Sequence, residues 1–264
     1  MKVSLVQTQL HWENRERNLA RIERHLAEAH PQTDLIVLPE MFSTGFSMNA
    51  AQLAEEPEGP SFQWMKHQAQ TYSAVVMGSL IIKDHHHFYN QLLAVFPDAG
   101  PCLRYNKRHL FRMAKEDEHY SAGNGKVSFT YKSFTIQPLI CYDLRFPVWS
   151  RNTLLDPLED GGSGYDVLVY VANWPERRGS QWTKLLQARA IENQCYVIGV
   201  NRVGVDGNGI LYRGDSAVYD PWGDPIVEIR RGESVETVEL DHEKLTNYRR
   251  HFPTWQDADS FQLN

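Results

Sequence analysis

The sequence predicts a single layered α/β domain over residues 1–264. Apolar segments of strand length alternate along the whole chain with longer segments of helical periodicity, and this alternation is typical of layered α/β folds. The 264 residues are 42% hydrophobic, which is enough for a substantial core. No internal repeat, low-complexity tract or linker divides the chain, so one continuous domain is expected.

In the first half of the chain, a strand and a helix are followed by hairpin strands. Residues 2–9 largely alternate apolar and polar side chains, as a strand does. Asn14 can cap the next segment, in which Leu19, Ile22 and Leu26 recur at helical spacing. Further patterns predict strands at 35–40, 74–83, 88–96 and 102–107 and a helix at 61–72. The turn signal PDAGP joins the last two strands into a hairpin.

Strands and helices also alternate in the second half. A polar, glycine-containing loop is expected at 112–126. The predicted strands are a pair within 128–142, single strands at 165–173 and 195–203, and short strands within 214–223, 226–230 and 234–240. The predicted helices lie near 146–156, at 180–194 and at 242–252. The short strands between 74 and 142 favour a mixed sheet, and the pattern leaves open whether one large sheet or two stacked sheets form.

Composition and charge narrow the class of protein. A net charge of -6 and a pI near 6.0 argue against a nucleic-acid partner, because phosphates attract basic surfaces. No apolar stretch is long enough to span a membrane, and no secretory signal is visible. Cys102, Cys141 and Cys195 lack the spacing of a disulfide framework or a zinc site. We therefore expect a cytoplasmic protein, in a reducing compartment and without a membrane partner.

The segment FTIQPLICYDLRFP, residues 134–147, carries the clearest signal for chemistry. An apolar run ends at Cys141, and the charged residues Asp143 and Arg145 follow at once. The thiolate is the reactive form of cysteine, and a nearby cation or a helix N-terminus favours it. The alternative is a core cysteine, since free cysteine is among the most buried residue types.

Three reactive side chains, Glu40, Lys107 and Cys141, each stand at the end of a predicted strand. A rigid sheet can hold several such groups at one edge. Taken singly, Glu40 could be a solvated loop acid and Lys107 a charge at a hairpin end. Taken together, the carboxylate can accept the thiol proton before the thiolate attacks a carbonyl or nitrile carbon. The lysine and the backbone N–H of Tyr142 can then stabilise the oxyanion that forms.

Three segments, LPEMFSTGF, YNKRHLF and LICYDLRFP, resemble in this order the three signatures of the nitrilase superfamily of carbon–nitrogen hydrolases. Later segments, including YVANWP and QARAIENQCYVIGVNRVG, are also similar, so the resemblance covers nearly the whole chain. The resemblance implies a four-layer α-β-β-α sandwich and a homodimer in which two sandwiches pack together. It also places the Glu–Lys–Cys triad of the family on Glu40, Lys107 and Cys141.

Many members of this superfamily have a second glutamate shortly before a Tyr/Phe-x-x-Gly loop. In the segment EDEHYSAG, Glu116 matches the family spacing to Gly123, and Glu118 is its rival. The resemblance implies that this glutamate orients Lys107 and the substrate, and the alternative is a mobile loop acid. Neither a cofactor nor a metal ion is implied.

The segment CYDLRFP is most similar to the ω-amidase branch, which hydrolyses the terminal amide of 2-oxoglutaramate and related 2-oxo acids. The carboxylate of such a small molecule would suit Arg145, whose alternative role is a structural ion pair with Asp143. Asn173 and Trp174 follow a buried strand and are expected to face the same cleft. The alternatives are an N-carbamoyl amine hydrolase, an aliphatic amidase or, outside enzymes, a family member that mainly binds partners. A nitrile substrate fits less well than an amide.

Overall fold

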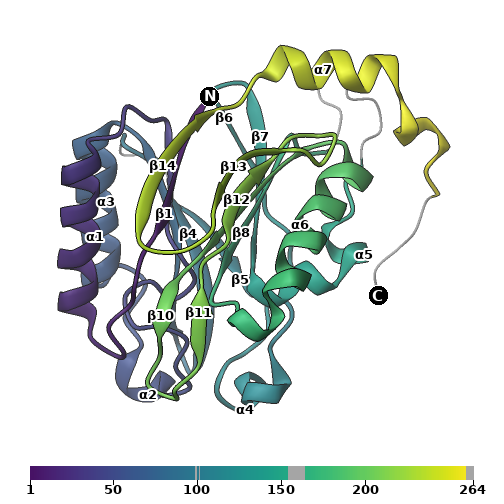
Figure 1. Ribbon diagram of the computed structural model, residues 1–264. Coiled ribbons are helices and arrows are strands. Elements are labelled where there is room, and N and C mark those ends of the chain that lie inside the picture. The colour runs from purple at the N-terminus through teal and green to yellow at the C-terminus, as the bar shows by residue number, and fades with distance from the viewer. Residues whose placement is uncertain (99, 101, 154–163, 260–264) are drawn as a thin grey trace.

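Two stacked six-stranded β-sheets lie between two layers of helices in this computed structural model (Figure 1). The structure describes residues 1–98, 100, 102–153 and 164–259. The four-layer α-β-β-α sandwich implied by the sequence resemblance is confirmed. The question of one sheet or two, which the strand pattern left open, is decided in favour of two.

The first sheet is mixed. Its strand order is β14 (Ser234–Glu239), β1 (Lys2–Gln7), β2 (Leu35–Val37), β3 (Val75–Asp84), β4 (His87–Val95) and β5 (Leu103–Asn106). Strand β2 pairs in parallel with both β1 and β3, whereas β3, β4 and β5 are joined as antiparallel hairpins. Strand β14 comes from the far end of the sequence and pairs antiparallel with β1.

The second sheet brings two strand ends to one edge. Its order is β13 (Pro225–Ile229), β12 (Ser216–Tyr219), β9 (Tyr196–Asn201), β8 (Val167–Ala172), β7 (Phe134–Ile140) and β6 (Phe129–Tyr131). Strands β7, β8 and β9 are parallel, so the carboxyl ends of β7 and β8 lie side by side, with Ile140 opposite Val171. A separate antiparallel ribbon contains β10 (Val203–Val205) and β11 (Leu211–Arg213). Such carboxyl ends are a usual place for ligand sites in α/β folds.

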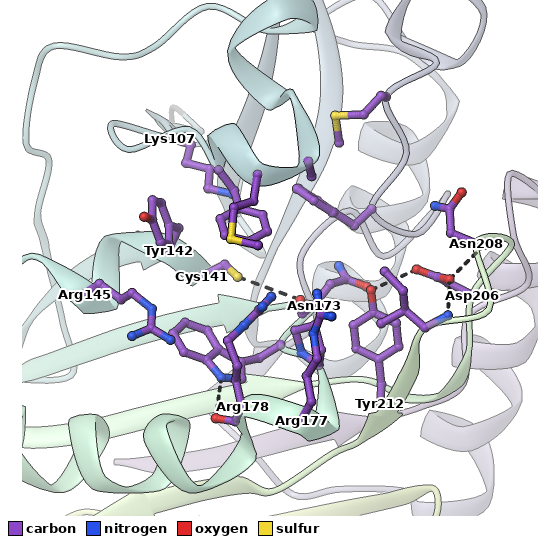
Figure 2. A pocket seen from close by; sticks show the side chains of 18 residues that line it. Lys107, Cys141, Tyr142, Arg145, Asn173, Arg177, Arg178, Asp206, Asn208 and Tyr212 are labelled. Carbon is purple, nitrogen blue, oxygen red and sulfur yellow. Dashed lines mark hydrogen bonds between the residues drawn. The ribbon is translucent and has the colours of Figure 1, made fainter.

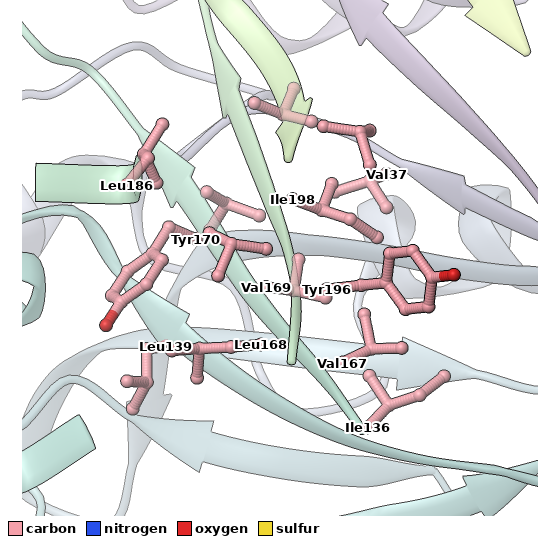
Figure 3. Packing of buried hydrophobic residues seen from close by; sticks show 14 of the residues in the cluster. Val37, Ile136, Leu139, Val167, Leu168, Val169, Tyr170, Leu186, Tyr196 and Ile198 are labelled. Carbon is pink, nitrogen blue, oxygen red and sulfur yellow. The ribbon is translucent and has the colours of Figure 1, made fainter. Parts of the chain in front are cut away.

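An apolar core fills the space between the sheets and continues on the other face of the second sheet, where Leu186 packs (Figure 3). Strand β2 shows how the sequence divides its two faces, because successive side chains of a strand point to opposite sides. Leu35 and Val37 belong to the core between the sheets, whereas Ile36 packs in the cluster beneath the helices. Strands covered on both faces are apolar throughout, which explains the continuous apolar runs in the sequence.

The helices form the outer layers and several connections. They are α1 (Arg15–Ala29), α2 (Ala50–Leu53), α3 (Pro60–Tyr72), α4 (Glu116–His119), α5 (Pro147–Ser150), α6 (Gly179–Asn193) and α7 (His242–His251). Short 3-10 turns occur at Arg112–Ala114, Cys141–Arg145, Glu176–Arg178 and Thr254–Asp257. Helices α1 and α3 cover the first sheet, where Ile22 and Met65 are fully buried. Helices α5 and α6 lie on the other side of the sandwich (Figure 1).

Local sequence determines where α1 begins and how closely α6 packs on the second sheet. Asn14 caps α1 as predicted, because its side chain accepts a hydrogen bond from the backbone N–H of Arg17 at 3.1 Å. Gly199 in β9 lets α6 approach closely, since a Cβ atom there would lie 2.8 Å from the ring of Trp182. No helix in the described ranges of the chain has the length and apolar character needed to cross a membrane.

Three predicted elements differ from the structure. The strand predicted at 35–40 ends at Val37, after which the chain turns away from the sheet. The loop predicted at 112–126 contains a 3-10 turn and α4, whose buried side chain is the polar Glu116, so no apolar periodicity marks the helix. The helix predicted near 146–156 is limited to Pro147–Ser150, and residues 154–156 lie outside the described residues. The PDAGP turn also includes two such residues, 99 and 101.

Candidate active site

A cavity of about 350 Å³ lies beside the carboxyl ends of β7 and β8 (Figure 2). Its volume is in the range of small-molecule sites. Predicted site residues on its wall are Lys107, Cys141, Tyr142, Arg145, Asn173 and Trp174. Glu40 and Glu116 are fully buried behind Lys107. All eight predicted residues therefore belong to one region of the molecule.

The backbone at the end of β7 presents Cys141 to the cavity. The strand ends at Ile140, and a 3-10 turn begins directly at Cys141. Cys141 has a φ angle of 44°, in the left-handed region that residues other than glycine rarely adopt. Strained residues of this kind collect at functional sites, where the surrounding structure holds them. Its Sγ lies 4.0 Å from the carbonyl oxygen of Asn173, at the end of the neighbouring strand.

Lys107 connects two buried carboxylates. Its Nζ lies 2.9 Å from Oε1 of Glu40 and 2.9 Å from Oε2 of Glu116, and all three side chains are fully buried. Burial alone would lower the pKa of Lys107, but the charges of Glu116, Glu40 and Cys141 raise it above its usual value. The lysine is therefore a permanent ammonium ion. The cluster contains two acidic side chains, Glu40 and Glu116, and one cation, Lys107.

Two asparagines hold Glu40 in position. Nδ2 of Asn90 donates to Oε1 of Glu40 at 2.7 Å and to Oε1 of Glu116 at 3.3 Å. The backbone N–H of Asn173 donates to Oε2 of Glu40 at 2.8 Å, and its Nδ2 donates to the Glu40 carbonyl oxygen at 2.5 Å. The remaining side-chain atom of Asn173, Oδ1, is buried and has no hydrogen-bond partner in the described part of the chain.

The surroundings of Cys141 keep its thiol protonated. Burial raises the pKa of Cys141 well above its usual value, and Glu40 raises it further through its charge and a side-chain hydrogen bond. The ammonium of Lys107 opposes this shift but does not reverse it. The ammonium of Lys107 therefore does not bring the pKa of Cys141 down to favour the thiolate, because burial and the two carboxylates outweigh it. A base must remove the proton before the sulfur can attack.

Helix α4 carries both candidate glutamates, but their side chains lie in different surroundings. Glu116 is fully buried, and its carboxylate accepts hydrogen bonds from Nζ of Lys107 and, at 2.6 Å, from the backbone N–H of Phe111. Glu118 is exposed and forms an ion pair with Lys115 at 3.6 Å. Glu116 is thus the glutamate that reaches the lysine.

Asp143 joins the turn after β7 to the segment after β5. Its fully buried carboxylate accepts hydrogen bonds from the Tyr105 hydroxyl at 2.7 Å and from the backbone N–H groups of Ile140 and His109, both at 3.0 Å. The alternative of an ion pair between Arg145 and Asp143 is therefore wrong. The guanidinium of Arg145 instead donates to the side chain of Gln181.

Arg145, Tyr142 and Trp174 form part of the cavity wall. The guanidinium carbon of Arg145 lies 4.9 Å from the ring centroid of Trp174, and the same guanidinium donates to the side-chain oxygen of Gln181. The ring of Tyr142 meets that of Phe111 edge-on, with 5.0 Å between centroids. Aromatic rings thus cover part of the cavity wall, and polar and charged side chains lie between them.

Sequence reasoning missed several residues of this region. They are Asn90, Asp206, Tyr212, Arg177 and Arg178. Nothing in the sequence marks Asn90, which lies inside a strand. Arg177 and Arg178 follow the YVANWP segment after one residue, Glu176, so a pair of cations shortly after a strand end was a usable signal. In the described residues, no group of three or more His, Cys, Asp or Glu side chains could hold a metal ion.

Replacing Gly123 by alanine is expected to lower both stability and activity. A Cβ atom at this position would lie 2.8 Å from Cβ of Asn106 and even closer to its carbonyl oxygen, and backbone cannot yield as a flexible side chain can. Asn106 directly precedes Lys107, whose carbonyl oxygen accepts the Gly123 N–H at 2.9 Å. We expect a loss of about 1–3 kcal/mol in unfolding free energy and roughly 10-fold or more in kcat.

Gly125→Ala is the matched control for Gly123→Ala. No atom of the described residues lies within 4 Å of a Cβ at Gly125, so this substitution should change neither quantity. Thermal unfolding and turnover are measured for both variants. Equal behaviour of the two would show that the contact with Asn106 does not position the lysine.

The layered fold and the buried acid–lysine–thiol cluster are features of carbon–nitrogen hydrolases. The family model described as carbon-nitrogen hydrolase matches residues 2–250, and the chain belongs to this family. It is 46% identical to omega-amidase YafV of Escherichia coli, covering 100% of this chain and 98% of that protein. It is 30% identical to the 2-oxoglutaramate amidase of Bacillus subtilis, covering 97% and 96% of the two chains.

Solved structures agree with this assignment. A CN-hydrolase superfamily protein from Xanthomonas campestris, with an arsenic adduct in its active site, matches with a TM-score of 0.95 and 43% identity, covering 100% of this chain and 99% of that one. Nit3 from Saccharomyces cerevisiae, a member of branch 10 of the nitrilase superfamily, matches with a TM-score of 0.81 and 27% identity, covering 96% and 94%. The predicted membership of the nitrilase superfamily, and the similarity to ω-amidases, are confirmed.

Proposed function

We propose that this protein is an amidase that hydrolyses the terminal carboxamide of a small 2-oxo acid such as 2-oxoglutaramate. The observation that carries the proposal is the full-length similarity to omega-amidase YafV, at 46% identity. The cavity of about 350 Å³, with Cys141 and Lys107 on its wall, has room for such a small molecule. Arginines on the same wall suit a substrate with a carboxylate at its far end.

In the proposed first step, the enzyme is acylated. Glu40 accepts the proton of the Cys141 thiol, and the sulfur attacks the amide carbon. Nζ of Lys107 and the backbone N–H of Tyr142 stabilise the resulting oxyanion, since N–H groups in a first helical turn have no partner inside the helix. When the oxyanion collapses, the C–N bond breaks, Glu40 returns its proton to the leaving nitrogen, and ammonia departs.

In the proposed second step, water releases the product. Glu40 takes a proton from water, whose oxygen attacks the thioester carbon, and the same two donors hold the second oxyanion. Collapse breaks the C–S bond, and the thiolate of Cys141 regains its proton from Glu40. Glu116 keeps Lys107 aimed at the oxyanion through its ion pair. No cofactor takes part in this scheme.

Asn173 is proposed to orient the substrate amide. Its Oδ1 is a buried hydrogen-bond acceptor without a partner in the described residues, and the residue lines the cavity next to Cys141. An unpaired buried acceptor is costly, and an N–H of a substrate amide would satisfy it. Trp174 and Arg145 then close the wall along the body of the substrate.

The experiment is to measure ammonia release from 2-oxoglutaramate, an aliphatic amide, an N-carbamoyl amino acid and a nitrile. We expect the highest kcat/KM for 2-oxoglutaramate and an acyl group on Cys141, detected by mass spectrometry after acid quench. The highest value for the N-carbamoyl compound would assign the protein to N-carbamoyl hydrolysis instead. No turnover of any compound would favour a family member that mainly binds partners.

We also propose that the protein forms a homodimer through the outer layer that contains α5 and α6. Val148 on α5 is 51% exposed and Ile191 on α6 is 52% exposed, and both are large apolar side chains. A second copy of the chain would cover them. Sedimentation velocity should show twice the 30.5 kDa chain mass, and Ile191→Glu should shift the protein toward the monomer. A wild-type monomer at micromolar concentration would contradict the dimer.

The proposed compartment is the cytoplasm. Cys102, Cys141 and Cys195 are all free, and a nucleophilic thiol must remain reduced to work. Cell fractionation should recover ammonia-releasing activity with cytoplasmic markers, and recovery in an oxidising compartment would contradict this assignment.

A further inference from the structure

Three arginines line the cavity without an acidic partner. Arg145, Arg177 and Arg178 all contribute to the wall, and none of them forms an ion pair with another described residue. Figure 2 shows Arg177 and Arg178 extending from one side toward Cys141 and Asn173, whereas Arg145 lies to the side of them. The wall is strongly cationic in a chain whose net charge is -6.

The acid on the same wall forms no ion pair with these arginines in the described part of the chain. Asp206 also lines the cavity, but one oxygen accepts the Tyr212 hydroxyl at 2.9 Å. The other accepts the backbone N–H groups of Asn208 and Ile210, both at 2.9 Å. The carboxylate of Asp206 therefore holds the turn between β10 and β11 through three hydrogen bonds.

The three arginines differ in the contacts and the solvent exposure of their guanidinium groups. Arg145 is stacked on Trp174 and hydrogen-bonded to Gln181. Arg177 is exposed, so water and salt screen its charge. Arg178 is partly buried, and its side chain has only one described contact, the face of the Phe111 ring at 5.1 Å.

The backbone of Arg178 is held firmly although its guanidinium is free. Its carbonyl oxygen accepts the indole N–H of Trp174 at 2.9 Å, and its own N–H donates to the carbonyl oxygen of Pro175 at 2.9 Å. The fixed backbone sets where the side chain of Arg178 begins, and its planar guanidinium can offer two parallel N–H donors to a carboxylate, because none of them is used by another described residue.

The charges around Arg178 favour an anion at this place. Burial lowers the pKa of Arg178, and the positive charges of Arg177 and Arg145 lower it further, while the charge of Cys141 acts in the opposite direction. The guanidinium stays protonated, since arginine keeps its proton in proteins. Mutual repulsion of three cations is relieved when a carboxylate enters, and the relief is largest at the most buried unpaired cation.

We propose that Arg178 is the main receptor for the carboxylate at the far end of the substrate and that it makes the site selective for anionic amides over neutral ones. The proposal rests on the amidase function proposed above and adds the residue that determines its substrate class. The substrate class is a short amide with a carboxylate at the end opposite the scissile bond. Arg145 makes a smaller contribution because its guanidinium is already held by Trp174 and Gln181.

The first test compares two substrates that differ only at the far end. Levulinamide has the chain of 2-oxoglutaramate with a methyl group in place of the carboxylate. Arg178→Gln should raise KM for 2-oxoglutaramate by about 30-fold or more, the size of one charge-assisted hydrogen bond, with a smaller effect on kcat. The kcat/KM for levulinamide should stay within about 3-fold of wild type, and Arg178→Lys should recover part of the lost affinity.

Two control variants test whether the effect depends on the position of Arg178 or only on the net charge of the protein. Arg24→Gln removes one positive charge from α1, far from any cavity residue, and should leave both substrates unaffected. Arg145→Gln should raise KM for 2-oxoglutaramate less than Arg178→Gln does. An equal loss on both substrates in Arg178→Gln would show a structural role and overturn the proposal, as would a larger effect of Arg145→Gln.

The second test does not depend on turnover. Titration calorimetry measures binding of 2-oxoglutarate to Cys141→Ala and to the double variant Cys141→Ala/Arg178→Gln. We expect saturable binding that weakens by about 30-fold when Arg178 is replaced. If wild type releases no ammonia but this difference remains, the proposed reaction fails and the assignment of Arg178 stands. Equal affinity of the two variants, or no binding to either, would overturn the assignment.

Discussion

Replacing Cys141 by alanine is expected to abolish ammonia release, with kcat falling by roughly 10⁴-fold or more. The thioester cannot form without the sulfur, and the remaining groups only bind and polarise the amide. The fold should persist, because the substitution removes only the sulfur atom. The surrounding turn holds the backbone of residue 141 at its φ angle of 44°. We expect Tm within about 4 °C of wild type, measured beside turnover of 2-oxoglutaramate.

Cys102→Ala is the matched control for Cys141→Ala. Cys102 is half-buried outside the cavity, and burial raises the pKa of its thiol to about 11. Its thiol donates to the carbonyl oxygen of Leu103 and not to a carboxylate that could accept the proton, so it is a poor nucleophile at neutral pH. This variant should keep wild-type activity. Substantial turnover by Cys141→Ala, with Cys102→Ala also active, would rule out a thioester on Cys141 and end the proposed mechanism.

Replacing Lys107 by methionine is expected to remove both activity and a large part of the stability. The loss of one oxyanion donor alone lowers kcat by about 10²–10³-fold. The substitution also leaves the fully buried carboxylates of Glu40 and Glu116 without their cation, and breaking such a pair costs about 3–5 kcal/mol. In a chain of this size that corresponds to a fall in Tm of roughly 10 °C.

The pH dependence of this loss has a definite sign. Burial raises the pKa of Glu116, Lys107 opposes the shift, and Glu40 adds to it. Without Lys107, the pKa of Glu116 in the folded protein rises further above its value in the unfolded chain. A carboxyl with a raised folded pKa contributes stability at low pH that is lost as the pH rises through that pKa. The stability deficit of Lys107→Met should therefore be smaller near about pH 5 than near about pH 8.

The double variant Lys107→Met/Glu116→Gln separates stability from catalysis. A neutral glutamine removes one of the two uncompensated negative charges and can still accept the Phe111 N–H. We expect it to recover much of the lost Tm while activity stays absent. If Lys107→Met were as stable as wild type at both pH values, the carboxylates would not depend on the lysine as the structure indicates.

Much of the candidate site was visible in the sequence because its signals are local. Glu40, Lys107 and Cys141 each follow a strand pattern, and the structure gathers them at one cavity. The order of three motifs indicated the family, and spacing favoured Glu116 over Glu118. The alternative of an ion pair between Arg145 and Asp143 was wrong because a two-residue spacing in sequence says nothing about which donors come from other strands.

Other residues could not be found without the fold. Asn90 bridges Glu40 and Glu116 from inside β4, and only strand pairing places it there. The link from Asp143 to Tyr105 crosses from one sheet to the other. The raised pKa of Cys141 likewise depends on burial and on Glu40, which lies far away in the sequence. These hydrogen bonds and this pKa shift depend on which distant segments lie close together in space. The spacing of apolar residues along the sequence does not reveal that.

The sequence by itself determined the alternation of strands and helices, the apolar runs that become doubly covered strands, and the chemical identity of the acid, the lysine and the thiol. These follow from nearest-neighbour patterns, since side-chain spacing along a strand or helix is set by the backbone. Only the tertiary structure decided that two sheets stack, that two carboxylates share one ammonium, and that Arg178 reaches the cavity without an acidic partner among the described residues. Charge balance and burial depend on which distant segments meet, and packing of the whole chain sets that.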